Sequence, residues 1–160
     1  MFEEMRETAV SVTLNIFETM LFTFLEPRDA AEGRERSLLK SSVALVRGEI
    51  GFQGKHSGRL GLTLPLELAE RMASNFMGLE EERASESQAI DLVNELCNMI
   101  CGNLSSQLAR SGQGLSWNLA IPQTRVLSRP EMEEEATAKG IEVDFDADGD
   151  WVNLHIRFDA

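Results

Sequence analysis

Residues 91–103, DLVNELCNMICGN, are the stretch of this chain that decides the fold. They predict a helix that is apolar around most of its circumference and carries its polar groups in one row. At about 100° of rotation per residue, the row lies within about 40° of the pole opposite the apolar side. Its members are Asp91, Glu95, Asn98 and Gly102. The row therefore faces away from the core. Its glycine makes the helix less stable than alanine would by ~1 kcal/mol, but the missing side chain lets another molecule come close to the helix.

Length, composition and charge narrow the classes of protein that this chain can be. A chain of 160 residues suits one domain, residues 1–160, in which about 70 % of the surface of the unfolded chain is buried. Apolar residues make up 42 % and charged residues 26 %, as in a globular protein. The net charge of −12 repels phosphate backbones and anionic lipid surfaces, so neither nucleic acid nor a membrane is an expected partner.

We expect neither a targeting signal nor a membrane-spanning segment in the N-terminal part of the chain. Residues 1–4 are acidic or apolar, whereas a signal peptide begins with basic residues. The apolar run at residues 14–25 is too short to span a bilayer and is interrupted by Glu18. We therefore expect a cytoplasmic protein.

The two cysteines, Cys97 and Cys101, lie four residues apart on the buried side of the predicted helix. This spacing aims the two side chains poorly for a disulfide, and no second cysteine pair is present to complete a zinc site. We interpret both as small buried hydrophobic residues, and no metal site is expected.

Hydrophobic periodicity divides the chain into helices and strands. Helices are expected at residues 3–25, 66–77 and 87–110. Strands are expected at residues 42–52, 59–64, 123–127, 140–145 and 151–158. The order of helix, two strands, two helices and three strands predicts the α+β class, with long helices packed against a mostly antiparallel sheet. Between the strands, residues 128–139 are expected to form an acidic connection that is mobile or partly helical.

The C-terminal hairpin carries weaker signals. The last strand alternates around Asn153, His155 and Arg157, which predicts one wet face, and His56 and His155 are expected at the surface. Residues 144–150 are similar to the start of a calcium loop, but His155 stands where that loop needs a glutamate. We therefore expect a hairpin turn at residues 148–149.

The row has a faint echo in the first helix. A shift by 80 residues places Ser11, Asn15 and Glu18 over the positions of the row at residues 91, 95 and 98, with Asn and Glu exchanged. An ancient duplication would explain this recurrence, but chance similarity between two amphipathic helices is the simpler explanation.

The motif and its surroundings resemble the CheX-like chemotaxis phosphatases, which are relatives of CheC. The family signature is Asp or Ser, three residues, Glu, two residues, Asn, and a proline about twenty residues later. Here it is met by Asp91, Glu95, Asn98 and Pro122. The string at residues 94–103, the glycine-rich hairpin at residues 51–62 and the helix end at residues 73–78 are also similar to the family, and the resemblance covers residues 5–127.

The resemblance implies a function for the row. It implies that the protein hydrolyses the aspartyl phosphate of a phosphorylated CheY-type response regulator. Asn98 would place the attacking water, and Glu95 would grip a lysine of the regulator's site. Asp91 would extend this contact by one turn, while the small residues Gly102 and Ser105 would let the helix backbone approach. The regulator is expected to supply Mg²⁺, so this chain itself is expected to bind no cofactor.

The resemblance also implies a homodimer, formed by edge-to-edge pairing of strands. Two other functions stay open. One is a non-catalytic module that binds or scaffolds a response regulator through the same helix. The other is an acidic structural relative of flagellar switch components.

Overall fold

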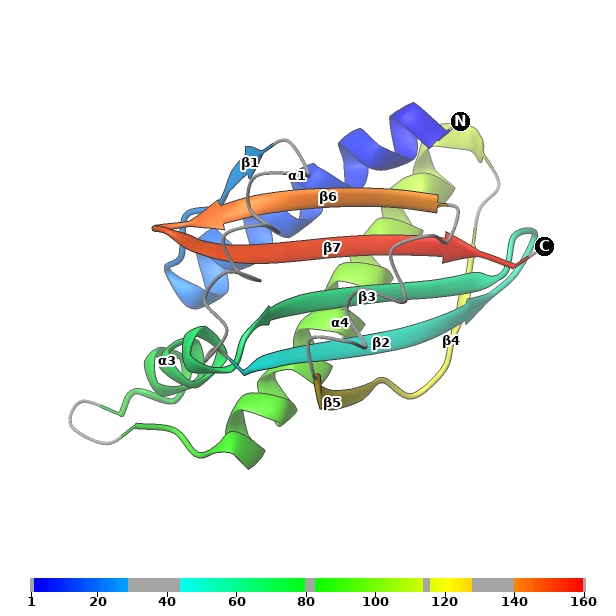
Figure 1. Cartoon of the computed structure of the whole chain (residues 1–160). Coiled ribbons are helices and arrows are strands. Elements are labelled where there is room, and N and C mark those ends of the chain that lie inside the picture. The colour runs from blue at the N-terminus through cyan, green and yellow to red at the C-terminus, as the bar shows by residue number, and fades with distance from the viewer. Residues whose placement is uncertain (1, 29–43, 80–82, 114–115, 128–139, 160) are drawn as a thin grey trace.

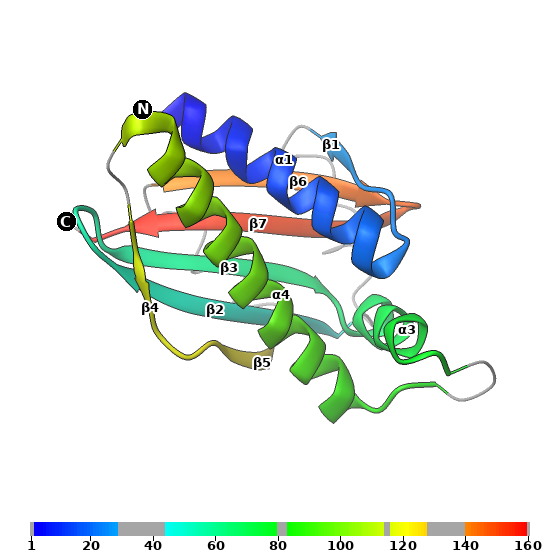
Figure 2. The same cartoon turned by 180° about the vertical axis from the view of Figure 1, so that it is seen from behind.

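The computed structural model describes residues 2–28, 44–79, 83–113, 116–127 and 140–159. Two long helices lie on one face of a single antiparallel sheet and a shorter helix lies at its end, as the two opposite views in Figures 1 and 2 show, which confirms the α+β class. The helices are α1 (Phe2–Leu21), α3 (Leu66–Met77) and α4 (Glu86–Leu108), and a π-helical turn, η1 (Ala109–Gln113), extends α4. The strands are β1 (Glu26–Arg28), β2 (Leu45–Gln53), β3 (Gly58–Pro65), β4 (Asn118–Leu119), β5 (Gln123–Leu127), β6 (Gly140–Ala147) and β7 (Asp150–Phe158). The acidic connection expected at residues 128–139 lies outside the described residues.

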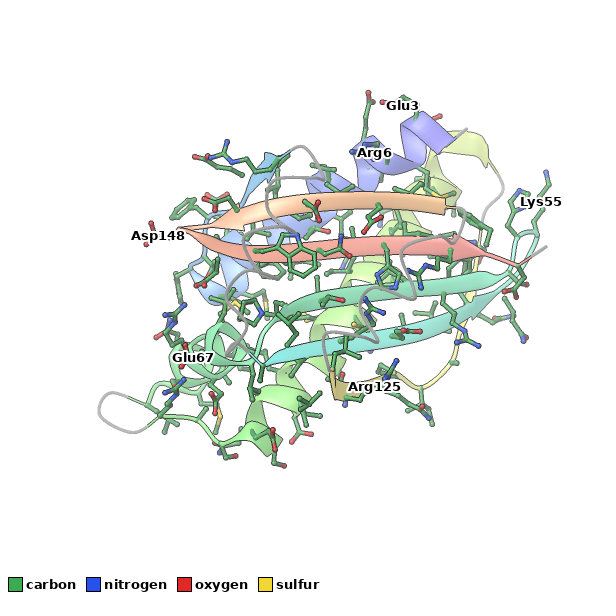
Figure 3. All side chains as sticks on the ribbon, in the orientation of Figure 1. Glu3, Arg6, Lys55, Glu67, Arg125 and Asp148 are labelled. Carbon is green, nitrogen blue, oxygen red and sulfur yellow. The ribbon has the colours of Figure 1, made fainter. Side chains whose placement is uncertain are left out.

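The sheet is built from two similar halves. Its strand order is β1-β6-β7-β3-β2-β4, with β5 also paired to β2. The hairpins β2–β3 and β6–β7 meet through β3 and β7, and the short strand of each half pairs with the hairpin of the other half, β1 with β6 and β5 with β2. Lys55 and Asp148, at the tips of the two hairpins, consequently lie at opposite ends of the sheet (Figure 3).

The two long helices, α1 and α4, are also similar to each other. From residue 8 to residue 18, every position of α1 has the same burial class as the position 80 residues later in α4. This agreement, together with the symmetric strand order, favours an internal duplication over chance as the origin of the similarity between the two helices.

The sheet accommodates α4 at a glycine of β2. A Cβ on Gly48 would lie 2.7 Å from Cγ1 of Val93 and 2.8 Å from Sγ of Cys97, so only glycine lets the helix rest this close to the strand. Burial raises the pKa of the Cys97 thiol, and likewise that of Cys101, to about 12. Both cysteines are fully buried in the core, which confirms their interpretation as small hydrophobic residues.

Helix α1 ends earlier than its periodicity predicts. It stops at Leu21 rather than at residue 25, because Phe22 adopts a left-handed conformation with φ of 52°. The backbone N–H of Thr23 then donates to the carbonyl of Phe17 at 3.0 Å and closes the helix end. Residues 22–25 lead from the helix end to β1 at the sheet edge, a position that tolerates Pro27.

The face of the sheet opposite the helices is more buried than the wet face that the alternation in β7 predicts. Asn153 and His155 are only 2 % and 3 % exposed, so the expectation of surface positions was wrong for both. Asn153 is paired within the sheet, where its Nδ2 donates to Asp144 at 2.7 Å and to Glu142 at 3.0 Å. The imidazole of His155 lies so close over Gly61 that a Cβ there would collide with it.

The expected hairpin turn at residues 148–149 is present. Asp148 and Gly149 both have positive φ, 51° and 96°, which fits the tight turns that join twisted strands. Among the helices of the described residues, none has the length and apolar character needed to cross a lipid bilayer.

Candidate functional site

Helix α4 is anchored at its start by a reciprocal cap. The Ser85 hydroxyl accepts from the N–H of Gln88 at 3.1 Å, and Oε1 of Gln88 accepts from the N–H of Ser85 at 2.8 Å. This capping box satisfies two backbone donors that a helix N-terminus otherwise leaves open. The buried residues of α4 hold the helix against the rest of the fold: Ala89, Leu92, Val93, Leu96, Cys97, Ile100, Cys101, Leu104, Ser105 and Leu108.

The polar row lies on the opposite side of α4, as predicted. Asp91, Glu95 and Asn98 are exposed, and Gly102 is half-buried. Their spacing of four, three and four residues places them one above the other on one helix face. Within the described part of the chain, no hydrogen bond or ion pair engages the side chain of Glu95 or Asn98. The structure thus brings the four together and leaves the carboxylate and the carboxamide open to a partner.

Gly102 is not required by packing inside the molecule. The nearest heavy atom to a Cβ built there is Cδ1 of Leu119, at 3.9 Å, an ordinary van der Waals distance. An alanine would fit, and it would stabilise the helix by ~1 kcal/mol.

Ser105 departs from the expected arrangement. It is only 7 % exposed, and its hydroxyl accepts a hydrogen bond of 2.9 Å from the backbone N–H of Trp117. The chain around Trp117 covers the last turn of α4 on this side. Ser105 therefore satisfies a buried donor of the fold and does not belong to the exposed row.

A groove runs along one flank of the row, between α3 and α4. It has a volume of about 370 Å³ and is lined by Ala73, Phe76, Met77, Gln88, Asp91, Leu92 and Glu95. Phe76 and Met77 are 48 % and 47 % exposed despite their size. Sequence reasoning missed both, because helical spacing from Met72 and Ala73 assigns Phe76 to the buried stripe of α3.

The segment that joins β4 to β5 forms the other flank. Leu119 lies beside Gly102, and the Thr124 hydroxyl donates to Oδ1 of Asn94 at 2.6 Å. Residues 120–123 connect these two anchors, and the connection lies below α4 in Figure 2. Ile121 in this segment is 86 % exposed.

The chemistry available to this site is limited by its shape. A row on a convex helix cannot exclude water by itself, so any reaction that it assists takes place where a partner covers it. The described residues contain no group of three or more side chains arranged to bind a metal ion. The row offers two carboxylates, Asp91 and Glu95, to pair with a cation and one carboxamide, Asn98, to position a small polar molecule.

Solved structures with a similar fold come from chemotaxis proteins. The chemotaxis protein CheX from Vibrio vulnificus is 21 % identical, with 98 % of this chain and 97 % of that chain covered and a TM-score of 0.73. A CheC-like superfamily protein from Shewanella sp. PV-4 is 21 % identical over 100 % of both chains, with a TM-score of 0.72. The CheX–CheY–BeF₃–Mg²⁺ complex from Borrelia burgdorferi contains a chain that is 17 % identical, with 100 % and 99 % covered and a TM-score of 0.71.

Sequence comparison with curated proteins finds no significant match. The family model of the chemotaxis phosphatase CheX, in contrast, matches residues 46–146, which is more than half of the chain and includes the complete polar row. This chain therefore belongs to the CheX family of chemotaxis phosphatases.

Proposed function

We propose that this protein hydrolyses the aspartyl phosphate of a CheY-type response regulator by placing α4 against the regulator's phosphorylated site. The observation that carries the proposal is the pair Glu95 and Asn98, exposed on a rigid capped helix and engaged by no other described side chain. Membership of the CheX family supports it. So does the likeness to the Borrelia burgdorferi structure, in which CheX is in complex with CheY, BeF₃ and Mg²⁺.

Asn98 has the chemistry needed to position the attacking water. An acyl phosphate is already activated, so the main requirement is a water held in line with the breaking P–O bond. A carboxamide both accepts from and donates to that water, and it carries no charge that would repel the phosphoryl oxygens. In this proposal the regulator provides the phosphorylated aspartate and the Mg²⁺, and this chain contributes no cofactor of its own.

Glu95 sets the position of the helix on the regulator. A carboxylate one turn before Asn98 pairs with a basic side chain of the regulator's site through charge-assisted hydrogen bonds. Asp91 adds negative charge one turn further out, and Gly102 lets the backbone of α4 come close. Since the spacing along one helix is fixed, pairing at Glu95 also fixes where the Asn98 carboxamide stands.

The test is release of phosphate from purified CheY-type receiver domains, with this protein present at substoichiometric amounts. Asn98→Ala should lower the maximal rate roughly a hundredfold, and Glu95→Ala should chiefly raise the KM for the receiver. Asn15→Ala and Glu18→Ala on α1 are matched controls, because these residues have the same burial on the similar helix. Full activity in both α4 variants would refute the mechanism. Binding of the receiver without turnover would indicate a non-catalytic module.

Homodimer formation is part of the same proposal. Within the described residues, β1 pairs with β6 only at residues 144–146, so residues 140–143 of β6 have an edge that no described strand covers. Such an edge can pair with a second copy. Light scattering coupled to size exclusion should report twice the chain mass; a monomer at micromolar concentration would contradict this expectation.

A further inference from the structure

We propose that the receiver domain docks on apolar surface at both flanks of the polar row, over Phe76 and Met77 on one side and against Ile121 on the other. We call these three side chains the apolar flanks. This inference rests on the proposed function, since it takes the receiver domain as the occupant. It assigns affinity for the receiver to side chains that lie outside the polar row.

The groove at Phe76 and Met77 is continuous with the row. Asp91 and Glu95 belong to both, because they line the groove and also stand on the exposed face of α4. A partner that pairs with Glu95 therefore covers part of the groove. An apolar floor, provided by Ala73 and Leu92, beneath two carboxylates suits a lysine or arginine of the partner, whose aliphatic stem packs on the floor while its charged head meets the acids.

Ile121 supplies the second flank. At 86 % exposed it is the most exposed large hydrophobic residue of the described chain, and packing within the molecule does not explain its choice. It is nevertheless held in place, because Pro122 restricts the backbone beside it and the contacts of Leu119 and Thr124 with α4 bracket the segment. An exposed isoleucine between two anchors on α4 offers apolar area to a surface that covers this flank of the row.

Charged contacts and apolar contacts have different effects on binding of the receiver. Exposed charges such as Asp91 mainly steer the encounter and fix the register, and they add little affinity. Apolar side chains that become fully covered on binding carry most of the affinity at protein interfaces. The apolar flanks should therefore control how tightly the receiver binds, while Asn98 controls how fast phosphate is released once it is bound.

The test uses Phe76→Gln, which suits a helix, and Ile121→Thr, which keeps a β-branched side chain; both remove apolar area. Phe24→Gln is the matched control, because Phe24 is 71 % exposed but lines a different cavity, with Arg71 and Asp148. Each variant is assayed for phosphate release across a range of concentrations of the phosphorylated CheY-type receiver that the wild type dephosphorylates fastest. Binding to CheY-type receivers loaded with beryllofluoride and Mg²⁺ is measured separately by calorimetry.

We expect each flank variant to raise the KM and the Kd about tenfold with the maximal rate unchanged, and the control to match the wild type. Unchanged KM and Kd in both variants, with normal turnover, would overturn the docking surface and leave the proposed phosphatase intact. Binding by the wild type without turnover, weakened by both variants, would support docking and refute the phosphatase. No binding and no turnover with any CheY-type receiver would overturn both.

Discussion

The hydroxyl of Thr124 donates a hydrogen bond of 2.6 Å to Oδ1 of Asn94 and thereby ties β5 to the helix that carries the polar row. Asn94 immediately precedes Glu95 and stands one turn before Asn98. The bond is one of two anchors that keep the segment containing Ile121 alongside α4. A link between a strand of the sheet and this helix makes the relative placement of row and flank a property of the fold rather than of a free loop.

Removing that hydrogen bond should lower the stability of the fold and leave the side chains of the polar row unchanged. Thr124→Val replaces the hydroxyl with a methyl group of similar size, and the loss of one partly buried hydrogen bond should lower the free energy of unfolding by about 1 kcal/mol. Urea denaturation measures this change. Thr124→Ser, which keeps the hydroxyl, is the control and should lose less; equal losses in both variants would show that packing, not the hydrogen bond, holds the segment.

Gly102→Ala should change stability and activity in opposite directions. Alanine is favoured over glycine in a helix by ~1 kcal/mol, and the nearest neighbour of the added Cβ is 3.9 Å away, so the melting temperature should rise. The same Cβ stands where a partner's surface approaches, so receiver dephosphorylation should become slower at low receiver concentration. A variant that is more stable and fully active would show that nothing approaches α4 at this position.

Ser105→Ala should be a stability variant rather than a functional one. It leaves the buried N–H of Trp117 without its acceptor, which should lower the free energy of unfolding by about 1–3 kcal/mol. Activity per folded molecule should stay the same, because the hydroxyl faces Trp117 and not a partner. The adjacent exposed Ser106 provides the control: Ser106→Ala should affect neither quantity. A variant with full stability but lower activity would show that Ser105 contacts the partner.

Local signals made the helices and the row predictable. Pro65 and Gly78 bound α3 where the sequence indicated, and Ser85 starts α4 within two residues of the expected position. The row could be found from angles alone, because the buried side of α4 is continuous and leaves only one face for polar groups. The family signature indicated that this face is functional, since periodicity alone does not separate a functional row from a solvated surface.

What the sequence could not provide depends on segments that meet from afar. Ser105 lies on the same side of α4 as the row, yet Trp117 folds back over it, and no periodicity reports that contact. Phe76 follows the buried stripe of α3 but lines the groove between α3 and α4, where it is exposed. β1 is only three residues long and becomes a strand through pairing with β6, which is more than 110 residues later in the chain.

The buried thiols should make stability fall at high pH. Burial raises the pKa of Cys97 and of Cys101 from 9.0 to about 12 in the folded protein, whereas an unfolded thiol ionises near its ordinary value. Between these two values the unfolded chain has lost protons that the folded protein keeps, so the free energy of unfolding decreases as pH rises. The chain has no tyrosine, so thiolate absorbance can be followed without interference from tyrosinate. We expect thiolate absorbance to rise near pH 9 in urea and only toward pH 12 in buffer. Stability should depend less steeply on pH in the Cys97→Ala/Cys101→Ala double variant. Native thiols that titrate near pH 9 would contradict the burial of this pair.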